Sequence, residues 1–386
     1  MNRESGMNRE PGEDRERGAN REQEPGGRYA FEEPGRFARG WHIVAFSQEL
    51  GAGEVKALHY FNLDLVLFRG ESGAAAVLDA YCPHLGAHLA GTGSRVIGDS
   101  LRCPFHGWQF DGAGSCTAIP YARKIPERAR SGALKAWPVV EKNGFIAIWH
   151  DPENGEPNWE LPDIPDWGPQ GWGDWRFNRA RIKAHGREII ENIVDIGHFP
   201  SVHGGVALQF DNTFTPYSVS QESRIQADAR AELIQPADFA LDLNQWRRQQ
   251  LSPDARQWGV GTYHGPAIMY FYNTSEGGYA PFKSWWVNYH TPINDTEVEL
   301  TSGVIVASLN ERPLPPEFVE NYPLAAIAAF SQDVEVWKTK IYRSDPILCD
   351  GDGPIHKLRK WYNRFYLPRA REHWDETPET ISSVRC

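Results

Sequence analysis

Two short segments of the chain each hold one cysteine and one histidine together with a proline and a glycine. The first segment reads CPHLGAH and contains Cys82 and His84, and the second reads CPFHGW and contains Cys103 and His106. Thiolate and neutral imidazole are good ligands for soft and borderline metal ions. A zinc finger normally takes two cysteines from one loop and two histidines from a helix. Because each segment here supplies one of each, the pattern favours a two-iron cluster in which one iron takes both cysteines and the other takes both histidines.

That ligand set is the Rieske [2Fe–2S] arrangement, and a mononuclear zinc site is the alternative. The run CPHLGAH…CPFHGWQFDGAG resembles the Rieske domain of ring-hydroxylating oxygenases. Respiratory Rieske proteins have a further cysteine in each segment, where this chain has Ala87 and Phe105. High-potential clusters also receive a hydrogen bond from a serine at the position of Trp108, so we expect a lower potential here. His88 lies outside the motif and is interpreted as a surface or supporting histidine.

A cluster of this kind transfers single electrons and does not itself activate a substrate, so a catalytic metal is expected elsewhere. The stretch HGREIIENIVDIGHF predicts a helix over 185–199 that Pro200 ends. Asp195 and His198 would share one face of this helix, and His203 would turn back toward His198. Two histidines in such a stretch are often structural by themselves, so the interpretation as a metal site depends on the Rieske motif upstream.

The D-x-x-H-x-x-x-x-H pattern of this stretch resembles the mononuclear iron motif of Rieske oxygenases. The resemblance implies Fe(II) held by His198, His203 and an acid from a later helix, with open positions for O2. Asp333 in AAFSQDVEVWKTKIY fits that acid, whereas its competitor Glu335 would point about 200° away around the helix. The resemblance also implies that Asp195 contacts a cluster histidine of a neighbouring subunit and relays the electron to iron.

Short apolar or alternating runs separated by glycine-containing turns begin at Gly40, which is typical of antiparallel strands. They predict an all-β Rieske domain over 38–150, followed by a Pro- and Trp-rich linker over 151–175. Residues 176–386 mix strands with helices and predict an α+β catalytic domain with an antiparallel sheet, and the resemblance implies a helix-grip (START-like) fold. Its predicted strands lie at 222–234, 265–273, 284–293 and 297–309, and its further helices at 323–343 and 354–366.

Residues 1–37 repeat a hexapeptide rich in Arg, Glu, Gly and Pro, so we expect a disordered tail. The chain shows no apolar signal segment and no run of 18 apolar residues, which predicts a cytoplasmic protein without a transmembrane segment. Its net charge of −11 disfavours nucleic acid as a partner, because phosphate binding needs clustered Lys and Arg.

Two further stretches, CTAIPYARKIPERAR and QDVEVWKTKIY…PILCDGDGPIHKLRKWYNRFY, resemble the steroid-acting branch of the Rieske oxygenases. The resemblance implies first an O2-dependent desaturation of a sterol, as in cholesterol 7-desaturases. The alternative is hydroxylation of a steroid or sterol, at the 9α position of a 3-ketosteroid or at a sterol C-4 methyl group. A hypothesis from a different functional class is a non-catalytic electron carrier fused to a lipid-binding module. Such a protein would lack the mononuclear iron.

The chain has no G-x-G-x-x-G motif between a strand and a helix, so NAD(P)H would act through a separate ferredoxin reductase-type donor. The resemblance further implies a homotrimer. A sterol needs a long apolar cavity, for which 265–273, 284–290 and 303–309 are candidate walls. Asn192 is a candidate for supporting the iron ligands, and Trp337 is a candidate for a wall of the site.

Overall fold

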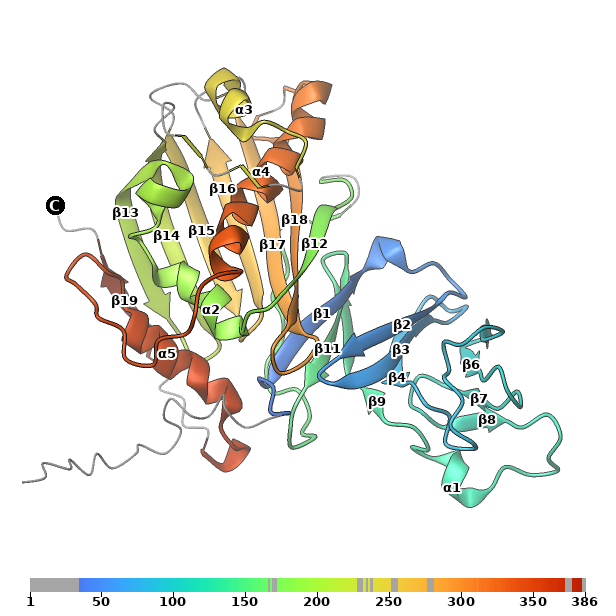
Figure 1. Cartoon of the computed structure of the whole chain (residues 1–386). Helices are drawn as coiled ribbons and strands as arrows, with labels where there is room; N and C mark the ends of the chain where they lie inside the picture. Colours follow the sequence, from blue (N-terminus) through green and yellow to red (C-terminus); the bar gives the residue numbers. More distant parts are fainter. Residues whose placement is uncertain are drawn as a thin grey trace, which may run out of the picture.

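The structure is a computed structural model that describes residues 35–165, 167–168, 172–227, 232–233, 235–236, 239–250, 256–275, 281–310, 312–371 and 377–383. The chain forms a smaller strand-rich part and a larger part in which helices lie against an extended sheet (Figure 1). Disorder is predicted for residues 1–37. Of these, 35–37 belong to the described residues and the others lie outside them. Within the described ranges, no helix is both long and apolar enough to cross a membrane.

Three antiparallel sheets make up the smaller part, in the orders β1-β11-β10, β2-β3-β4-β9 and β5-β6-β7-β8. The strands are β1 Gly40–Phe46, β2 Val55–Tyr60, β3 Leu63–Arg69, β4 Ala75–Asp79, β5 Arg95–Ile97, β6 Ser100–Arg102, β7 Gln109–Phe110, β8 Cys116–Ala118, β9 Ala136–Trp137, β10 Val139–Lys142 and β11 Phe145–His150. One short helix, α1, covers Glu127–Arg130 beside the third sheet (Figure 1). The predicted all-β character of this region is confirmed.

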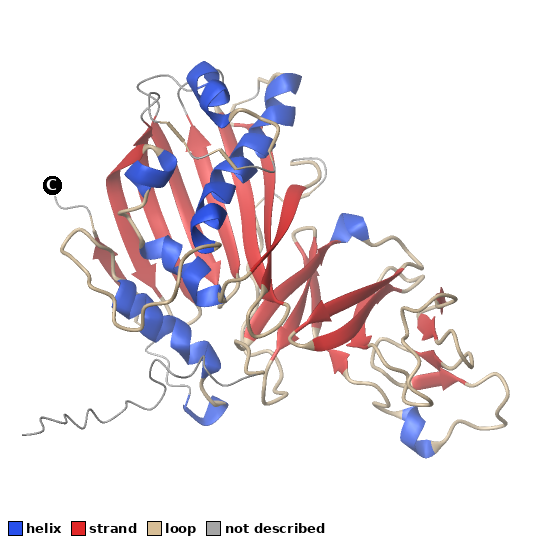
Figure 2. Cartoon of the chain, viewed as in Figure 1, coloured by secondary structure: helices blue, strands red, loops and turns tan. Residues whose placement is uncertain are grey.

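The larger part is built on one antiparallel sheet with the order β12-β18-β17-β16-β15-β14-β13-β19. Its strands are β12 Arg176–Ile182, β13 Gly205–Phe214, β14 Ser218–Ala227, β15 Arg256–His264, β16 Ile268–Ser275, β17 Phe282–Pro292, β18 Val298–Ser308 and β19 Glu379–Ser382. Its helices are α2 Gly186–Ile190, α3 Leu243–Gln250, α4 Pro316–Trp337 and α5 Ile355–Asn363. Helix α4 runs across one face of the sheet, and α3 packs against α4 near the ends of the strands (Figure 2). This is the α+β architecture that the sequence predicts.

The strands of the large sheet serve both parts of the molecule, because successive side chains of a strand face opposite sides. Ile268 and Tyr270 of β16 pack in one core with Trp41 and Phe46 of β1. The intervening residues Met269, Phe271 and Asn273 of the same strand line a cavity on the other face, under α4. The sheet therefore separates the smaller part from the cavity.

The predicted linker, residues 151–175, contains no helix or strand among its described residues, yet it is not an exposed connection. Leu161, Ile164, Trp172 and Trp175 are all buried in the core that β1 and the large sheet share. Burial of each such side chain stabilises the folded state by about 1.5–3 kcal/mol. The segment therefore packs against both parts of the chain and stabilises the contact between them.

The expected continuous helix over 185–199 is wrong. Helix α2 is followed by a 3-10 turn at Glu191–Val194, and the chain then becomes extended at Asp195 with φ −87° and ψ 101°. The Asp195 carboxylate accepts a hydrogen bond of 2.9 Å from the Gly197 backbone N–H, a local bond that competes with helix continuation. Pro200 does not end the helix but lies within a π-helical turn, Phe199–His203.

Helix α4 begins at Pro316, earlier than the predicted residue 323, and ends at Trp337 rather than at 343. Pro323 therefore lies inside the helix, where proline is normally unfavourable. Phe318 and Tyr322 pack with Val304 of β18, so tertiary burial overrides the local preference. Helix α5 and the following 3-10 turn to Tyr366 match the predicted helix at 354–366 closely.

Candidate iron sites

The two Cys-His loops share one backbone design although their histidines are spaced differently. In the first loop, Cys82 N–H donates to Ala87 O at 2.9 Å and Gly86 N–H donates to Cys82 O at 2.9 Å. The second loop has the same two bonds. Cys103 N–H donates to Trp108 O at 2.8 Å, and Gly107 N–H donates to Cys103 O at 3.2 Å.

Each loop turns at a glycine in the left-handed region. Gly86 has φ +75° and Gly107 has φ +74°, conformations that other residues adopt at a steric cost. A side chain at Gly107 would also meet the Arg102 guanidinium at 2.9 Å. The backbone conformation of the two loops therefore requires glycine at positions 86 and 107.

The four predicted cluster ligands differ in burial. Cys82 and Cys103 are 3% and 1% exposed, while His84 and His106 are half-buried with ring centroids 4.7 Å apart. Burial raises the pKa of the Cys82 thiol to about 11, and the adjacent Cys103 adds to this effect. Two neighbouring buried thiols paired with two imidazoles near the surface are a donor set that fits a [2Fe–2S] cluster of mixed ligands.

Aromatic residues cover the histidines of this site. Trp108 stacks on His84 with centroids 4.7 Å apart, and its indole N–H donates to the Tyr121 hydroxyl at 2.8 Å. Leu85 and Phe105 are 65% and 63% exposed, so apolar side chains border the histidines. His88 is half-buried, accepts from the Ala90 N–H at 3.1 Å and lies edge-on to Tyr81, which agrees with a supporting role.

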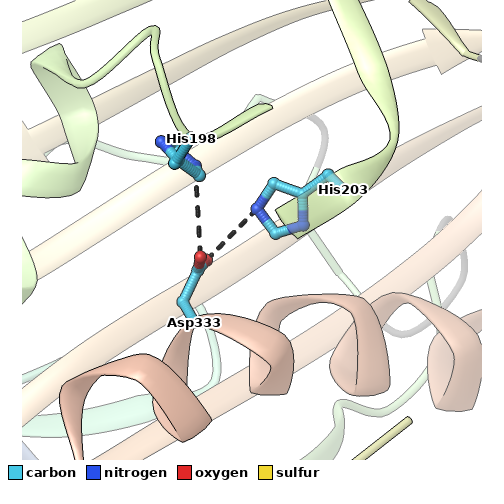
Figure 3. Close-up of side chains that lie close together, drawn as sticks. All are labelled: His198, His203 and Asp333. Carbon is cyan, nitrogen blue, oxygen red and sulfur yellow. Dashed lines mark ion pairs between the residues drawn. The ribbon is translucent and has the colours of Figure 1, made fainter. Parts of the chain in front are cut away.

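His198, His203 and Asp333 meet between the sheet and α4 (Figure 3). His203 Nε2 lies 3.4 Å from Asp333 Oδ2, and His198 Nε2 lies 4.0 Å from Asp333 Oδ1. One donor atom from each residue lies within 4.8 Å of the others. Two imidazoles and one carboxylate converging in this way could hold a single metal ion in the 2-His-1-carboxylate manner.

Neighbouring amides orient these donors. His203 Nδ1–H donates to Gln332 Oε1 at 3.1 Å, which directs the lone pair of Nε2 toward Asp333. Asn192 Nδ2 donates to Asp333 Oδ2 at 3.1 Å, as its position before the histidines had suggested. Gln332 is a residue that the motif analysis missed, and its position next to Asp333 was the available signal.

Asp195 lies on the outer side of His198. Its Oδ2 is 3.6 Å from His198 Nδ1, and its side chain is 39% exposed. Burial favours a higher pKa for Asp195, but the His198 imidazole and backbone N–H groups outweigh it and lower that pKa below its ordinary value. The carboxylate is therefore charged, reaches the surface and contacts a candidate ligand.

A buried ionic cluster anchors the segment that carries Asn192. Lys340 Nζ lies 2.9 Å from Glu188 Oε2 and 3.4 Å from Glu191 Oε2, and both carboxylates are buried. Arg359 Nε donates to Glu191 Oε1 at 2.5 Å. Lys340 lies just after the end of α4, the helix that carries Asp333, so the ionic contact and the Asn192–Asp333 hydrogen bond form two connections between the same two segments.

A cavity of about 270 Å³ opens beside His198, His203 and Asp333. Most of its walls are apolar or aromatic, including Phe199, Leu243, Trp246, Trp258, Met269, Phe271, Trp286, Ala325 and Phe330. Asn288 also lines it, and this residue is 2% exposed. Its Oδ1 accepts from Ser302 Oγ at 2.5 Å, whereas its buried Nδ2 has no hydrogen-bond partner among the described residues.

The predicted cavity walls are partly right. Alternate residues of 265–273 and 284–290 line the cavity, but none of 303–309 does, because Val304 and Val306 are covered by α4. Trp337 does not line it either and packs instead with Ile189 and Leu300 in a separate cluster. Glu335 pairs with Lys338 at 2.7 Å, away from the metal donors.

Family models match both parts of the chain. The Rieske [2Fe–2S] domain matches residues 40–138, and the 3-ketosteroid 9α-hydroxylase C-terminal domain matches residues 148–366. Among solved structures, dicamba monooxygenase bound to dicamba superposes with a TM-score of 0.63 at 17% identity, covering 86% of this chain and 98% of that one. This likeness concerns the fold.

Several curated proteins are similar over most of the chain. A Rhodococcus rhodochrous protein named "Probable 3-ketosteroid-9-alpha-monooxygenase, oxygenase component" is 37% identical over 345 residues, covering 86% of this chain and 81% of that protein. The Mycolicibacterium smegmatis 3-ketosteroid-9-alpha-monooxygenase oxygenase component is 33% identical over 360 residues, covering 90% and 86%. Cholesterol 7-desaturase nvd 1 of Ciona intestinalis is 33% identical over 351 residues, covering 87% and 70%.

The chain is thus a Rieske iron–sulfur oxygenase by class, with an N-terminal [2Fe–2S] domain and a catalytic domain on an antiparallel sheet. Within that class it belongs to the family defined by the 3-ketosteroid 9α-hydroxylase C-terminal domain. Members of this family are oxidoreductases, so the reading as a non-catalytic electron carrier is not retained.

Proposed function

We propose that this protein is the oxygenase component of a steroid hydroxylase. In this proposal Cys82, Cys103, His84 and His106 hold the [2Fe–2S] cluster. His198, His203 and Asp333 hold a mononuclear Fe(II). When bound, the cluster supplies single electrons and the mononuclear iron supplies activation of O2. The convergence of one donor atom from each of His198, His203 and Asp333 within 4.8 Å carries the proposal of the second iron.

The proposed reaction replaces one C–H bond of a steroid by C–OH. One O2, two electrons and two protons are consumed, and one oxygen atom leaves as water. Names of relatives support hydroxylation, since proteins named as 3-ketosteroid 9α-monooxygenase components match at 37% and 33% identity. The family model over the catalytic domain bears a hydroxylase description as well.

The cavity residues have two roles in this proposal. Aromatic and aliphatic walls such as Phe271 and Trp286 bury a flat apolar ring system and exclude water from the reacting carbon. Asn288 Nδ2, a buried donor without a partner among the described residues, donates to a substrate oxygen. A ketone accepts this bond and fits the apolar walls, so an oxygenated steroid is the preferred substrate class.

Electrons reach the chain in this proposal from NAD(P)H through a separate ferredoxin reductase-type protein. Within one chain the Rieske loops around β5–β8 lie at the end of the molecule remote from α4 (Figure 1). Asp195 is part-exposed beside His198, and its carboxylate could meet a cluster histidine of another copy. We therefore propose a head-to-tail homotrimer in which Asp195 connects the cluster of one subunit to the iron of the next.

The test supplies the purified protein with a ferredoxin-type reductase, NADH, O2 and a panel of 3-ketosteroids and sterols. A product heavier by one oxygen supports hydroxylation, and its position follows from nuclear magnetic resonance. An absence of turnover on every steroid, with both iron sites loaded, would exclude the substrate class.

Desaturation of a sterol, the first expectation from the sequence, is the second candidate. The 33% identity to a cholesterol 7-desaturase over 351 residues favours it. In the same assay, a product lighter by two hydrogens would replace hydroxylation by desaturation as the function.

A further inference from the structure

We propose that a basic surface beside the Rieske loops is the docking site for an acidic electron-donor protein of the ferredoxin type. The surface consists of Arg123, Lys124, Arg128 and Arg130 and is called the basic flank below. The inference deepens the proposed function, because it places the partner that would reduce the cluster.

Charge is distributed unevenly along this chain. Residues 81–130 contain six Lys or Arg against three Asp or Glu, although the whole chain has 40 against 51. A negatively charged partner is consequently repelled by most of the molecule and attracted to the end that carries the cluster ligands. Such asymmetry raises association rates and orients the encounter.

The basic flank follows closely on Tyr121, whose ring lies near both candidate cluster histidines. The Tyr121 ring lies 6.5 Å from the His84 ring and 6.4 Å from the His106 ring, centroid to centroid. The basic residues come two to nine positions later, around α1, which Figure 1 shows beside β8. A partner seated on them is held beside the ligands of the cluster.

The charges of the basic flank are available to a partner. All four side chains are exposed. Arg130 makes a solvent-exposed contact of 3.4 Å with Glu127. Within the described part of the chain, Arg123, Lys124 and Arg128 make no ion pair.

The composition of this surface favours a transient redox partner over a permanent subunit contact. Ala129 is buried and Ile125 half-buried in the Rieske core, so Tyr121 is the large apolar side chain that the segment exposes. Permanent subunit interfaces bury extensive apolar surface, whereas redox encounters are small and polar. In the proposed trimer, the apolar border at Leu85 and Phe105 meets the next copy and the basic flank remains for the donor.

The experiment compares two triple variants that change net charge equally. In the test variant Arg123→Glu, Lys124→Glu and Arg128→Glu reverse the basic flank. In the control variant Arg176→Glu, Arg224→Glu and Arg312→Glu reverse exposed charges of the larger part of the chain. Reduction of the cluster is followed by absorbance in stopped flow, with reduced plant-type [2Fe–2S] ferredoxin as the acidic donor. Photoreduced deazariboflavin serves as a small neutral donor.

At low ionic strength the test variant should accept electrons from ferredoxin at least about tenfold more slowly than the control variant. The difference should shrink toward zero at about 0.5 M salt, where exposed charges are screened. Reduction by deazariboflavin should be equal in all proteins, because it does not need the docking surface.

Equal ferredoxin rates in the two variants would overturn the proposal. So would dissociation of the oligomer in the test variant with unchanged ferredoxin rates, since the occupant would then be a second copy of this chain. The measurement involves neither steroid nor mononuclear iron, so a failure of the proposed hydroxylation leaves its outcome unaffected.

Discussion

Asn192 donates a hydrogen bond of 3.1 Å from its side-chain amide to Asp333, and so links the turn after α2 to the C-terminal part of α4 at the candidate metal site. Asp333 is 4% exposed and also faces His203 Nε2 at 3.4 Å. One carboxylate therefore receives an amide from one side and an imidazole from the other. The first prediction tests whether this carboxylate holds a metal.

Asp333→Asn should lower the iron content from about three to about two atoms per chain, because the site loses its one anionic donor. The visible spectrum of the [2Fe–2S] cluster should stay unchanged. Metal analysis of the purified protein measures the loss. Glu335→Gln, which alters an acid two residues away that pairs with Lys338, is the matched control and should retain all iron. Full iron occupancy in Asp333→Asn would remove Asp333 from the ligand set.

Lys340→Met should weaken binding of the mononuclear iron by about tenfold, because the two buried carboxylates at Glu188 and Glu191 lose a shared cation and shift the segment that carries Asn192. Stability should fall by about 2 kcal/mol, less than for a fully buried pair since the Lys340 side chain is 35% exposed.

Iron titration of the apo site measures this effect, and Lys340→Arg should restore the affinity. Lys338→Met removes a neighbouring lysine that pairs with Glu335 at the surface and is the control. Equal iron affinities in the two methionine variants would show that the ionic cluster is purely structural.

Asn288→Leu should weaken binding of a 3-ketosteroid by about tenfold, since it removes the proposed donor to the substrate oxygen. Binding of the corresponding 3-deoxysteroid should be unchanged or slightly tighter. Quenching of tryptophan fluorescence reports both affinities, because Trp258 and Trp286 line the cavity. If both ligands lose affinity equally, Asn288 shapes the cavity and does not recognise the oxygen.

Asp195→Asn should leave both iron sites occupied and abolish coupled turnover, because the charged contact beside His198 is lost while the ligands remain. Cluster reduction by the reductase should proceed normally and its reoxidation in the presence of substrate and O2 should become slow. Rapid reoxidation would contradict the relay role.

Stability should fall as the pH decreases from 6.5 toward 4. Burial lowers the pKa of His42 to about 4 and that of His150, His185 and His290 to about 3. These imidazoles are neutral in the folded protein but take up protons in the unfolded chain below its pKa near 6.5. Each therefore costs about 1.4 kcal/mol per pH unit in that window.

Thermal unfolding midpoints at pH 7.0, 6.0 and 5.0 measure this dependence. His42→Gln should flatten the profile relative to the parent protein, whereas the exposed His59→Gln should not. A constant midpoint across this range would contradict neutral burial of the four histidines.

Sequence alone was enough to predict the two-part architecture and to select His198, His203 and Asp333, whose side chains the structure brings together, because metal ligands come as fixed residue types at fixed spacings. The path of the chain between them was less predictable. Asp195 breaks the expected helix through its own hydrogen bond to Gly197 N–H, a contact that apolar periodicity does not report. Gln332 and Asn288 make their hydrogen bonds with residues distant in sequence, so no local pattern indicates their roles.

The cavity walls show the same limit. Runs of apolar residues in β16, β17 and β18 are equally suited to a cavity and to a core. Trp286 faces the cavity, while Val304 beside it is covered by α4, and only the placement of that helix decides between them.

The buried connection at 151–175 has a consequence for how activity depends on conditions. A hinge that swung the cluster toward the catalytic site would have to expose Leu161, Ile164, Trp172 and Trp175 to water, at about 1.5–3 kcal/mol each. The spacing between the two candidate iron sites of one chain is therefore fixed. In the proposed trimer, electron transfer depends on how many chains are assembled, so specific activity should decline on dilution of the protein.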